Sequence, residues 1–244
     1  MSISLSIIVP AYNEEARLGD SVRSILAFIE DRKLDAELII IDDGSTDATT
    51  EVAKKTCAEF PDSETSVIRY DDNRGKGFAV KTGMISAQGR IVLFSDADLS
   101  TPIEEYKKLV DPIENGDFDL TFGSRALDRT LIGEHQPWRR EQGGKIFNFF
   151  VRTLTGMPFW DTQCGFKAFN MEKFRPLLDR MTIDRFGFDV EFLYVANKAG
   201  LRLKEIPVRW NNDERTKVNI FRDSIRMFGE VREIRKNSKK GLYS

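Results

Sequence analysis

The chain of 244 residues is 41% hydrophobic and 31% charged, a composition typical of a globular protein with a sizeable core. This composition excludes disordered, collagenous and fibrous proteins, and no segment approaches the roughly 20 apolar residues that span a bilayer. Two separated cysteines and no apolar N-terminal leader favour a reduced, cytoplasmic setting over a disulfide-built secreted fold. The formal net charge of −2 points to no preferred electrostatic partner.

That net charge hides an uneven distribution. Residues 201–244 carry twelve lysines and arginines against six acidic residues, so this tail has a balance of +6 and the rest of the chain −8. A basic tail on an acidic body indicates where an anionic partner could bind, and a solvated C-terminal helix explains the same pattern without one. No nucleic-acid partner is expected.

The first half of the sequence alternates β-rich runs with segments of helical periodicity. Strands are expected at 4–9, 36–41, 65–70, 90–95 and 117–122, with helices at 14–31, after 45, after 75 and from 102. Continuous runs of branched apolar residues separated by helices predict an α/β fold, a Rossmann-like sandwich with a mainly parallel central sheet and helices on both faces. Ligands bind such sheets at the carboxyl ends of the strands.

The alternation of strand and helix patterns ends after residue 123, where the sequence becomes rich in arginine and aromatic residues. Structure is expected to resume with residues 162–169, a helix at 189–198, a strand at 202–209 and a last helix at about 220–236. No linker or repeat divides the chain, so we expect one domain, 1–244, whose halves are 1–123 and 124–244.

Acidic or amide side chains follow four of the predicted strands. They are Asn13/Glu14, Asp42/Asp43, Asp71/Asp72 and Asp96/Asp98. Because the carboxyl ends of parallel strands meet at one edge, these residues predict a single site. Asp96 and Asp98 can converge on a hard divalent cation that also shares phosphate oxygens, although such a pair also suits turns.

The four motifs PAYNEE (10–15), DDGSTD (42–47), NRGKG (73–77) and DAD (96–98) together resemble the ordered motifs of family 2 glycosyltransferases with the GT-A fold. In the second half, GSR (123–125), DTQCGFK (161–167) and FDVE (188–191) are similar to the polyprenyl-phosphate branch, nearest to the dolichyl-phosphate β-glucosyltransferases. The likeness covers roughly residues 3–235. It implies a nucleotide-sugar-binding half at 1–123 and an acceptor half at 124–244.

The resemblance also implies a role for individual residues. The nucleotide-binding residues would be Pro10, Ala11, Tyr12, Glu14, Asp43, Lys76, Asp96, Ala97 and Arg215. The catalytic residues would be Asp98, Arg125, Arg139, Arg140 and Lys217. Asp98, with Asp96, would bind Mg²⁺ or Mn²⁺. Relatives in the mannosyl branch carry Gln where this chain has Ser100, which leaves a third protein ligand open.

The cationic residues of this set would divide between two phosphate groups. Arg125, Arg215 and Lys217 would neutralise the diphosphate of the donor, and Arg139 or Arg140 would hold the phosphate of the acceptor.

A segment at 145–155 has apolar residues near helical spacing: Ile146, Phe149, Phe150 and Leu154. This pattern is typical of a core helix, and equally of an interfacial helix that lies on a membrane with Lys145 and Arg152 toward the head groups. Trp160 and the basic residues of the last helix would suit the same boundary. A peripheral contact with the cytoplasmic face of a membrane is therefore expected.

These observations favour an inverting, metal-dependent transfer of a hexose, by resemblance glucose, from a UDP-sugar such as UDP-glucose to a polyprenyl or dolichyl phosphate. The second pKa of a phosphate monoester is roughly 6, so this acceptor needs no general base. One alternative is a GDP-mannose donor or a hydroxyl acceptor, which would need Asp161, Asp189 or Glu191 as base. Another is a non-catalytic nucleotide-sugar-binding scaffold. The type of polyprenol and the oligomeric state are left open.

Overall fold

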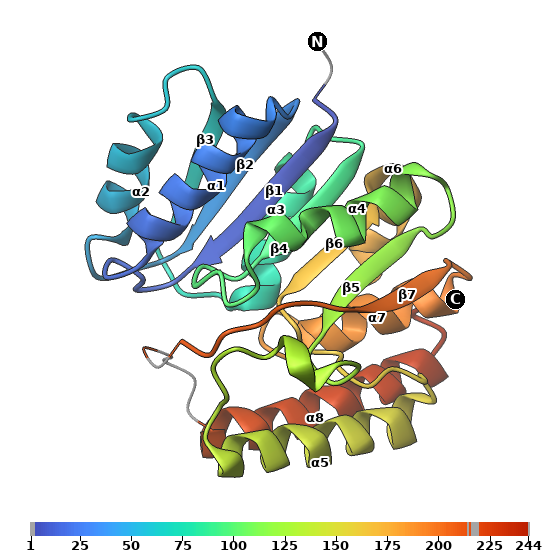
Figure 1. Cartoon of the computed structure of the whole chain (residues 1–244). Coiled ribbons are helices and arrows are strands. Elements are labelled where there is room, and N and C mark those ends of the chain that lie inside the picture. The colour runs from blue at the N-terminus through green and yellow to red at the C-terminus, as the bar shows by residue number, and fades with distance from the viewer. Residues whose placement is uncertain (1–2, 214, 216–219, 244) are drawn as a thin grey trace.

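The computed structural model describes residues 3–213, 215 and 220–243, and all of their side chains except those of 139 and 220–224. One sheet has the strand order β3-β2-β1-β4-β6-β5-β7 (Figure 1). Its strands are β1 Leu5–Ala11, β2 Ala36–Asp43, β3 Glu64–Tyr70, β4 Ile91–Ser95, β5 Leu120–Ser124, β6 Phe166–Asn170 and β7 Leu203–Pro207. The α-helices are α1 Leu18–Arg32, α2 Thr49–Cys57, α3 Lys76–Ser86, α4 Tyr106–Glu114, α5 Trp138–Thr155, α6 Met171–Phe174, α7 Phe188–Lys198 and α8 Ile220–Lys239.

The mainly parallel sheet is confirmed, with one reversed strand. β1 pairs in parallel with β2 and β4, β2 with β3, and β5 with β7. β6 is antiparallel to both of its neighbours, β4 and β5. Apolar runs in buried parallel and antiparallel strands look alike in a sequence, so the pattern did not reveal the reversal.

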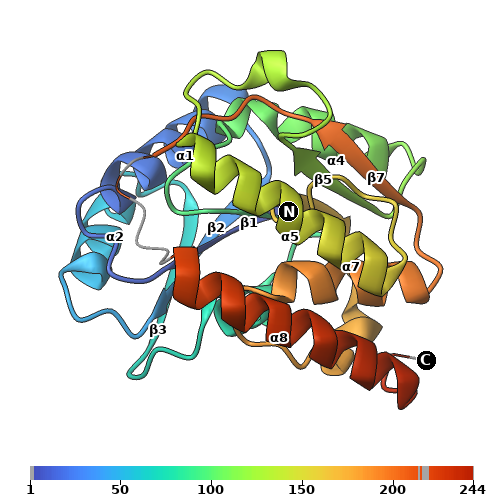
Figure 2. The same cartoon turned by 90° about the horizontal axis from the view of Figure 1, so that it is seen from below.

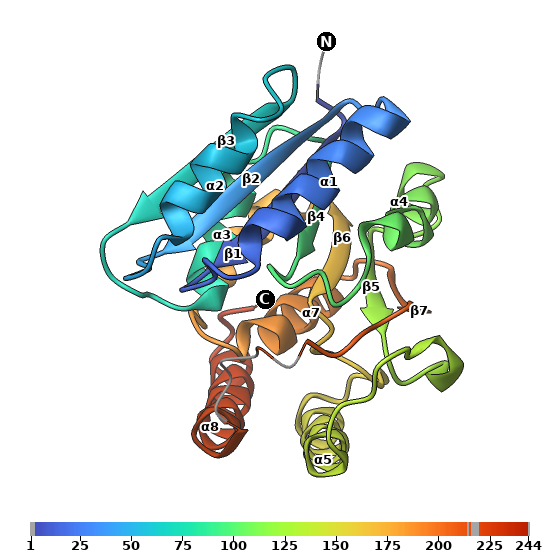
Figure 3. The same cartoon turned by 60° about the vertical axis from the view of Figure 1, so that its left-hand side comes forward.

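Helices cover both faces of the sheet because successive side chains of a strand point to opposite sides. In β1, Ile7 and Val9 belong to a core shared with α1, α2 and α4, whereas Ile8 belongs to a core shared with α3 and α7. Figure 3 shows α1, α2 and α4 on one side of the sheet. Each fully buried Ile or Val contributes about 1.5–3 kcal/mol, so this alternation fixes the register of the central strand.

Helices α5 and α8 run side by side in the same direction beneath α7 (Figures 1 and 2). The ring of Phe228 contacts Phe147 and Phe150, and seven residues further along α8 the guanidinium of Arg235 donates to the carbonyl of Leu154. The interpretation as a core helix is confirmed in part, and contact of this segment with a membrane stays a prediction. Phe147 and Val151 lie in the core, while other apolar side chains of α5 face outward.

We find no helix, among those in the described parts of the chain, with the length and hydropathy needed to cross a membrane.

Candidate active site

The loops that follow β1 and β2 are tied together at the carboxyl edge of the sheet. The backbone N–H of Asn13 donates to Oγ of Ser45 at 2.9 Å, and the backbone N–H of Thr46 returns a bond to Oδ1 of Asn13 at 2.8 Å. The backbone N–H of Glu14 donates to Oγ1 of Thr49 at 2.7 Å. These bonds hold the motifs at 10–15 and 42–47 next to each other. Pro10 and Ala11 end β1 within the first of these motifs, and Tyr12 is 41% exposed.

The carboxylate of Asp43 fixes the third motif. Its Oδ1 accepts from the backbone N–H of Arg74 at 2.8 Å, and its Oδ2 accepts from the N–H of Gly75 at 2.9 Å and from Asn73 Nδ2 at 2.8 Å. Gly75 has φ +113°, a conformation that favours glycine, and a side chain there would meet the carbonyl of Asp184. Asp43 therefore shapes the loop from which α3 begins, and its contact with a nucleoside stays a prediction.

Asp96 lies between two segments of the chain that are distant in sequence. Its Oδ1 is 2.6 Å from Nζ of Lys76 at the start of α3, and its backbone N–H donates to the carbonyl of Gly165 at 3.0 Å. Burial would lower the pKa of Lys76, but the charges of Asp96 and Asp189 outweigh it and raise the pKa. The lysine is therefore a permanent cation beside the acidic pair. Ala97, between the two carboxylates, is buried.

A chain of buried charges extends behind Lys76. Oδ2 of Asp189 lies 3.7 Å from its ammonium, and Oδ1 of Asp189 accepts from Nζ of Lys167 at 2.5 Å. Lys167 is fully buried, and its ammonium also donates to the carbonyl of Cys164 at 2.6 Å. Breaking such a buried pair by removing one partner costs about 3–5 kcal/mol, so these residues hold Lys76 from the interior.

The acidic pair fits a divalent cation. Burial and the charge of Asp96 raise the pKa of Asp98, because two close carboxylates disfavour each other's ionised form. Oxygen donors that repel one another are suited to Mg²⁺ or Mn²⁺, which would relieve that repulsion. Within the described residues no cluster of three or more His, Cys, Asp or Glu could hold a metal ion. As metal ligands, Asp96 and Asp98 stay a prediction, in which ligand oxygens or water would fill the remaining positions.

Arg125 is held in a fixed orientation. Its Nε and Nη2 donate to the two oxygens of Asp161 at 2.7 and 2.8 Å, and its backbone N–H adds a third bond at 3.0 Å. Burial alone would raise the pKa of Asp161, but the charge and hydrogen bonds of Arg125 outweigh it and lower the pKa. Glu205 on β7 accepts from the backbone N–H groups of Trp160 and Asp161, and so fixes the loop that carries this aspartate.

Arg140 lies near this group. The pKa of its guanidinium is lowered by partial burial and by the charge of Arg125, while Asp98 acts in the opposite direction. Arg215 forms a two-bond pair with Asp213 at 3.0 and 2.7 Å. Lys217 and the side chain of Arg139 lie outside the described residues, so their roles stay predictions.

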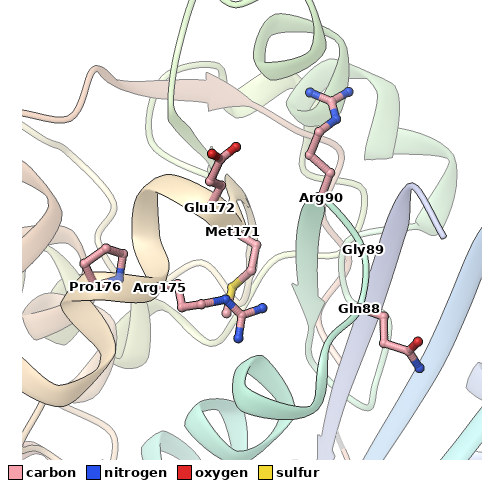
Figure 4. Close-up of a pocket in the computed structure, with 7 residues that line it drawn as sticks. All are labelled: Gln88, Gly89, Arg90, Met171, Glu172, Arg175 and Pro176. Atoms are coloured by element: carbon pink, nitrogen blue, oxygen red, sulfur yellow. The ribbon is translucent and has the colours of Figure 1, made fainter. Parts of the chain in front are cut away.

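A hollow of about 390 Å³ lies at the other edge of the sheet. Figure 4 shows its lining residues, which come from the start of β4 and from the chain around α6. They are Gln88, Gly89, Arg90, Met171, Glu172, Arg175 and Pro176. Asp96 follows the opposite end of β4, so this hollow is separate from the acidic pair.

Several residues that organise the site were not predicted from the sequence. They are Arg17, Gly165, Lys167, Glu205 and Asp213. Only two of them had a signal in the sequence: Gly165 and Lys167 belong to the 161–167 motif, but the contacts that explain them come from residues far away in the chain.

Comparisons with known proteins agree with the fold and the motifs. Residues 6–178 match Glycosyl transferase family 2. A dolichyl-phosphate β-glucosyltransferase of Dictyostelium discoideum is 36% identical over 244 residues, covering 96% of this chain and 74% of the relative. The human enzyme of the same name is 34% identical, covering 95% of this chain and 74% of the relative.

Solved structures show the same fold at low sequence identity. A glucosyl-3-phosphoglycerate synthase of Mycobacterium tuberculosis, in complex with Mn²⁺, UDP-glucose and phosphoglyceric acid, has a TM-score of 0.67 at 19% identity, covering 96% of this chain and 80% of that one. A mannosyl-3-phosphoglycerate synthase of Rubrobacter xylanophilus has a TM-score of 0.68 at 20% identity, covering 98% and 75%. The GT-A fold is thereby confirmed, and the chain belongs to glycosyltransferase family 2 and is a glycosyltransferase.

Proposed function

We propose that this glycosyltransferase moves glucose from UDP-glucose to a polyprenyl phosphate such as dolichyl phosphate, with Mg²⁺ or Mn²⁺ at Asp96 and Asp98 and with inversion at the anomeric carbon. The names of the curated relatives support the acceptor and the hexose. The synthase complex with Mn²⁺ and UDP-glucose supports the cation and the donor.

The observation that carries the choice of acceptor is the state of the three carboxylates that could serve as a base. Both oxygens of Asp161 are bound to Arg125, which lowers the pKa of Asp161. Asp189 lies between two lysines. Glu191 is fully buried and accepts from the backbone of residues 182 and 183 and from the hydroxyl of Tyr243. A hydroxyl acceptor needs a base near neutral pH, whereas a phosphate does not.

In the proposed reaction a phosphate oxygen of the acceptor attacks the anomeric carbon in line, and the bond from that carbon to the β-phosphate oxygen breaks to release UDP. A divalent cation supplies charge neutralisation to the diphosphate. Arg125, oriented by Asp161, and Arg215 would stabilise the charge that develops on the leaving group, together with Lys217. Arg140, with Arg139, would hold the acceptor phosphate.

The outward side of α5 supports an acceptor in a membrane. Trp138, Ile146 and Phe149 are 73%, 64% and 73% exposed, and Trp160, in the segment after α5, is 55% exposed. We name these four residues the α5 face. The guanidinium of Arg152 lies 3.9 Å from the ring centroid of Trp160, so a cation accompanies the apolar groups. Exposed aromatic residues with adjacent cations suit the head-group layer of an anionic bilayer, and we propose peripheral attachment on the cytoplasmic side.

A donor and acceptor screen tests the proposal directly. Purified protein with Mn²⁺ is given UDP-glucose or GDP-mannose, together with dolichyl phosphate, undecaprenyl phosphate or a free sugar, and products are identified by mass. Glucosyl phosphoryl lipid from UDP-glucose is expected, and it should be absent with Asp98→Asn. Transfer to the free sugar alone would overturn the acceptor. UDP binding without any transfer would favour a scaffold.

A further inference from the structure

Arg17 brings together three segments that are far apart in the sequence. It directly precedes α1, and its side chain is only 9% exposed. Its Nε and Nη2 donate to the two carboxylate oxygens of Glu14, the Nη2 bond being 2.8 Å. This fork holds the guanidinium plane in one orientation at the end of the first motif.

The third nitrogen of the guanidinium points between two further carboxylates. Nη1 of Arg17 lies 3.5 Å from Oδ2 of Asp98 and 3.3 Å from Oδ2 of Asp213. It is buried, and within the described residues it has no hydrogen-bond partner in good geometry. A buried donor without a hydrogen bond lowers the stability of the fold by about 1–3 kcal/mol. The surrounding structure must therefore hold Nη1 of Arg17 in this position.

The segment that carries Asp213 is docked on both of the other segments. The backbone N–H of Asn211 donates to the carbonyl of Ser100 at 2.8 Å, immediately after the acidic pair. Nη1 of Arg215, whose fork holds Asp213, lies 3.4 Å from the carbonyl of Ala16, the residue before Arg17. This segment therefore runs from β7 to the start of α1, where Arg17 contacts it through Asp213.

We propose that Arg17 is a positioning residue: through its ion pair with Asp213 it fixes Arg215 against the carbonyl of Ala16 at the start of α1 and thereby sets the affinity for a nucleoside diphosphate. The identity of that ligand rests on the proposed function. Arg17 acts through other residues, because Glu14 already occupies two of its three nitrogens. A lysine could replace its charge but could not hold Glu14 and Asp213 together with a planar fork.

A double-mutant cycle of Arg17→Gln and Asp213→Asn tests this contact. Amide exchange of Asn211 in the ligand-free protein reports the docking of the segment, and calorimetry with UDP and Mn²⁺ reports affinity. Each single variant should accelerate the exchange and weaken UDP binding about tenfold, which is about 1.4 kcal/mol. The double variant should bind UDP no more weakly than the worse single variant, because the two changes have the Arg17–Asp213 contact in common.

Asp213→Asn keeps the proposal testable if Arg17→Gln fails to fold, since it removes the same ion pair, weakens the Arg215–Asp213 pair as well, and leaves the Arg17–Glu14 fork in place. Arg23→Gln is the matched control, because Arg23 lies on α1, the helix that Arg17 precedes, in an exposed pair with Glu59. It should change neither measurement.

Three outcomes would decide against the positioning role: additive effects in the cycle, unchanged amide exchange in both variants, or Arg17→Lys behaving as the unaltered protein. Faster amide exchange in both variants would support the positioning role of the Arg17–Asp213 contact even if the unaltered protein bound no UDP. Absence of UDP binding by the unaltered protein would contradict only the proposed function.

Discussion

A Cβ atom added to Gly165 would lie 2.0 Å from Oδ2 of Asp96. β6 begins one residue later and runs antiparallel to β4, so its entrance passes directly beside the end of β4. No side chain fits at that point without displacing the carboxylate. The glycine of the 161–167 motif therefore makes room for a residue of the 96–98 motif.

Gly165→Ala should move Asp96 and weaken Mn²⁺ binding at least tenfold, while the fold is retained. Electron paramagnetic resonance of Mn²⁺ in the presence of UDP measures the binding, and circular dichroism measures the melting temperature. Gly229→Ala is the control, because Gly229 lies on α8 with nothing within 4 Å of an added Cβ. Equal Mn²⁺ affinity in both variants would show that Asp96 is not a ligand.

Asp161→Asn should lower activity by disordering Arg125, without removing a limb of the pH–rate profile. The partly buried Arg125 would lose its charged partner, at a cost of about 3 kcal/mol in the free energy of unfolding. The folded-state pKa of Asp161 is lowered, so the group stays ionised throughout the pH range above its ordinary value and has no titration there. Rate profiles from pH 5 to 9 measure this. A limb that vanished only in Asp161→Asn would identify a general base.

Phe149→Glu should reduce attachment to vesicles that contain phosphatidylserine, because a charge replaces an exposed ring on the α5 face. Co-sedimentation measures the bound fraction, which we expect to fall several-fold. Ile85→Glu serves as control, since Ile85 is 60% exposed on α3, away from α5. Turnover of a water-soluble short-chain phosphate acceptor should be unchanged in both variants. Equal attachment of both would argue against the α5 face.

Asp119→Asn should destabilise the protein at neutral pH, on the order of 2 kcal/mol, and less in acid. Hydrogen bonds from Arg202 and Lys173 hold the folded-state pKa of Asp119 well below its usual range. This stabilisation is complete above the unfolded-state pKa of about 3.9 and is lost as the pH falls toward the folded-state value. Urea unfolding measures the free energy of unfolding of the unaltered protein and of Asp119→Asn at pH 7 and pH 3.5. The difference between the two proteins should be smaller at pH 3.5. Asp117→Asn, an exposed neighbour, is the control.

The sequence predicted the parts of the fold that depend on local periodicity. The strands of the first half, the edge that bears the acidic residues and the last helix all lie near their expected positions. Helix α5 begins at Trp138, seven residues before the expected segment, because Gly143 and Gly144 interrupt the apolar pattern that marks a helix.

The site was harder to predict because its contacts join distant residues. Arg125 and Asp161 are 36 residues apart, and Lys76 reaches Asp189 across more than one hundred. Asp43 was expected to contact a nucleoside. The sequence did not reveal that its carboxylate accepts three hydrogen bonds from a loop some 30 residues away. Residue types show which chemistry is available, whereas the tertiary fold decides which partner each group meets.

The reversed strand β6 has a consequence for how the protein can be divided. β5 ends the first half of the chain, and both of its neighbours in the sheet, β6 and β7, come from the second half. A cut after β5, at residue 124, would leave that strand with no partner and would open one edge of β4. Exchanging the residues after β5 for those of a relative would therefore also replace the strand that lies beside β4 and the glycine next to Asp96.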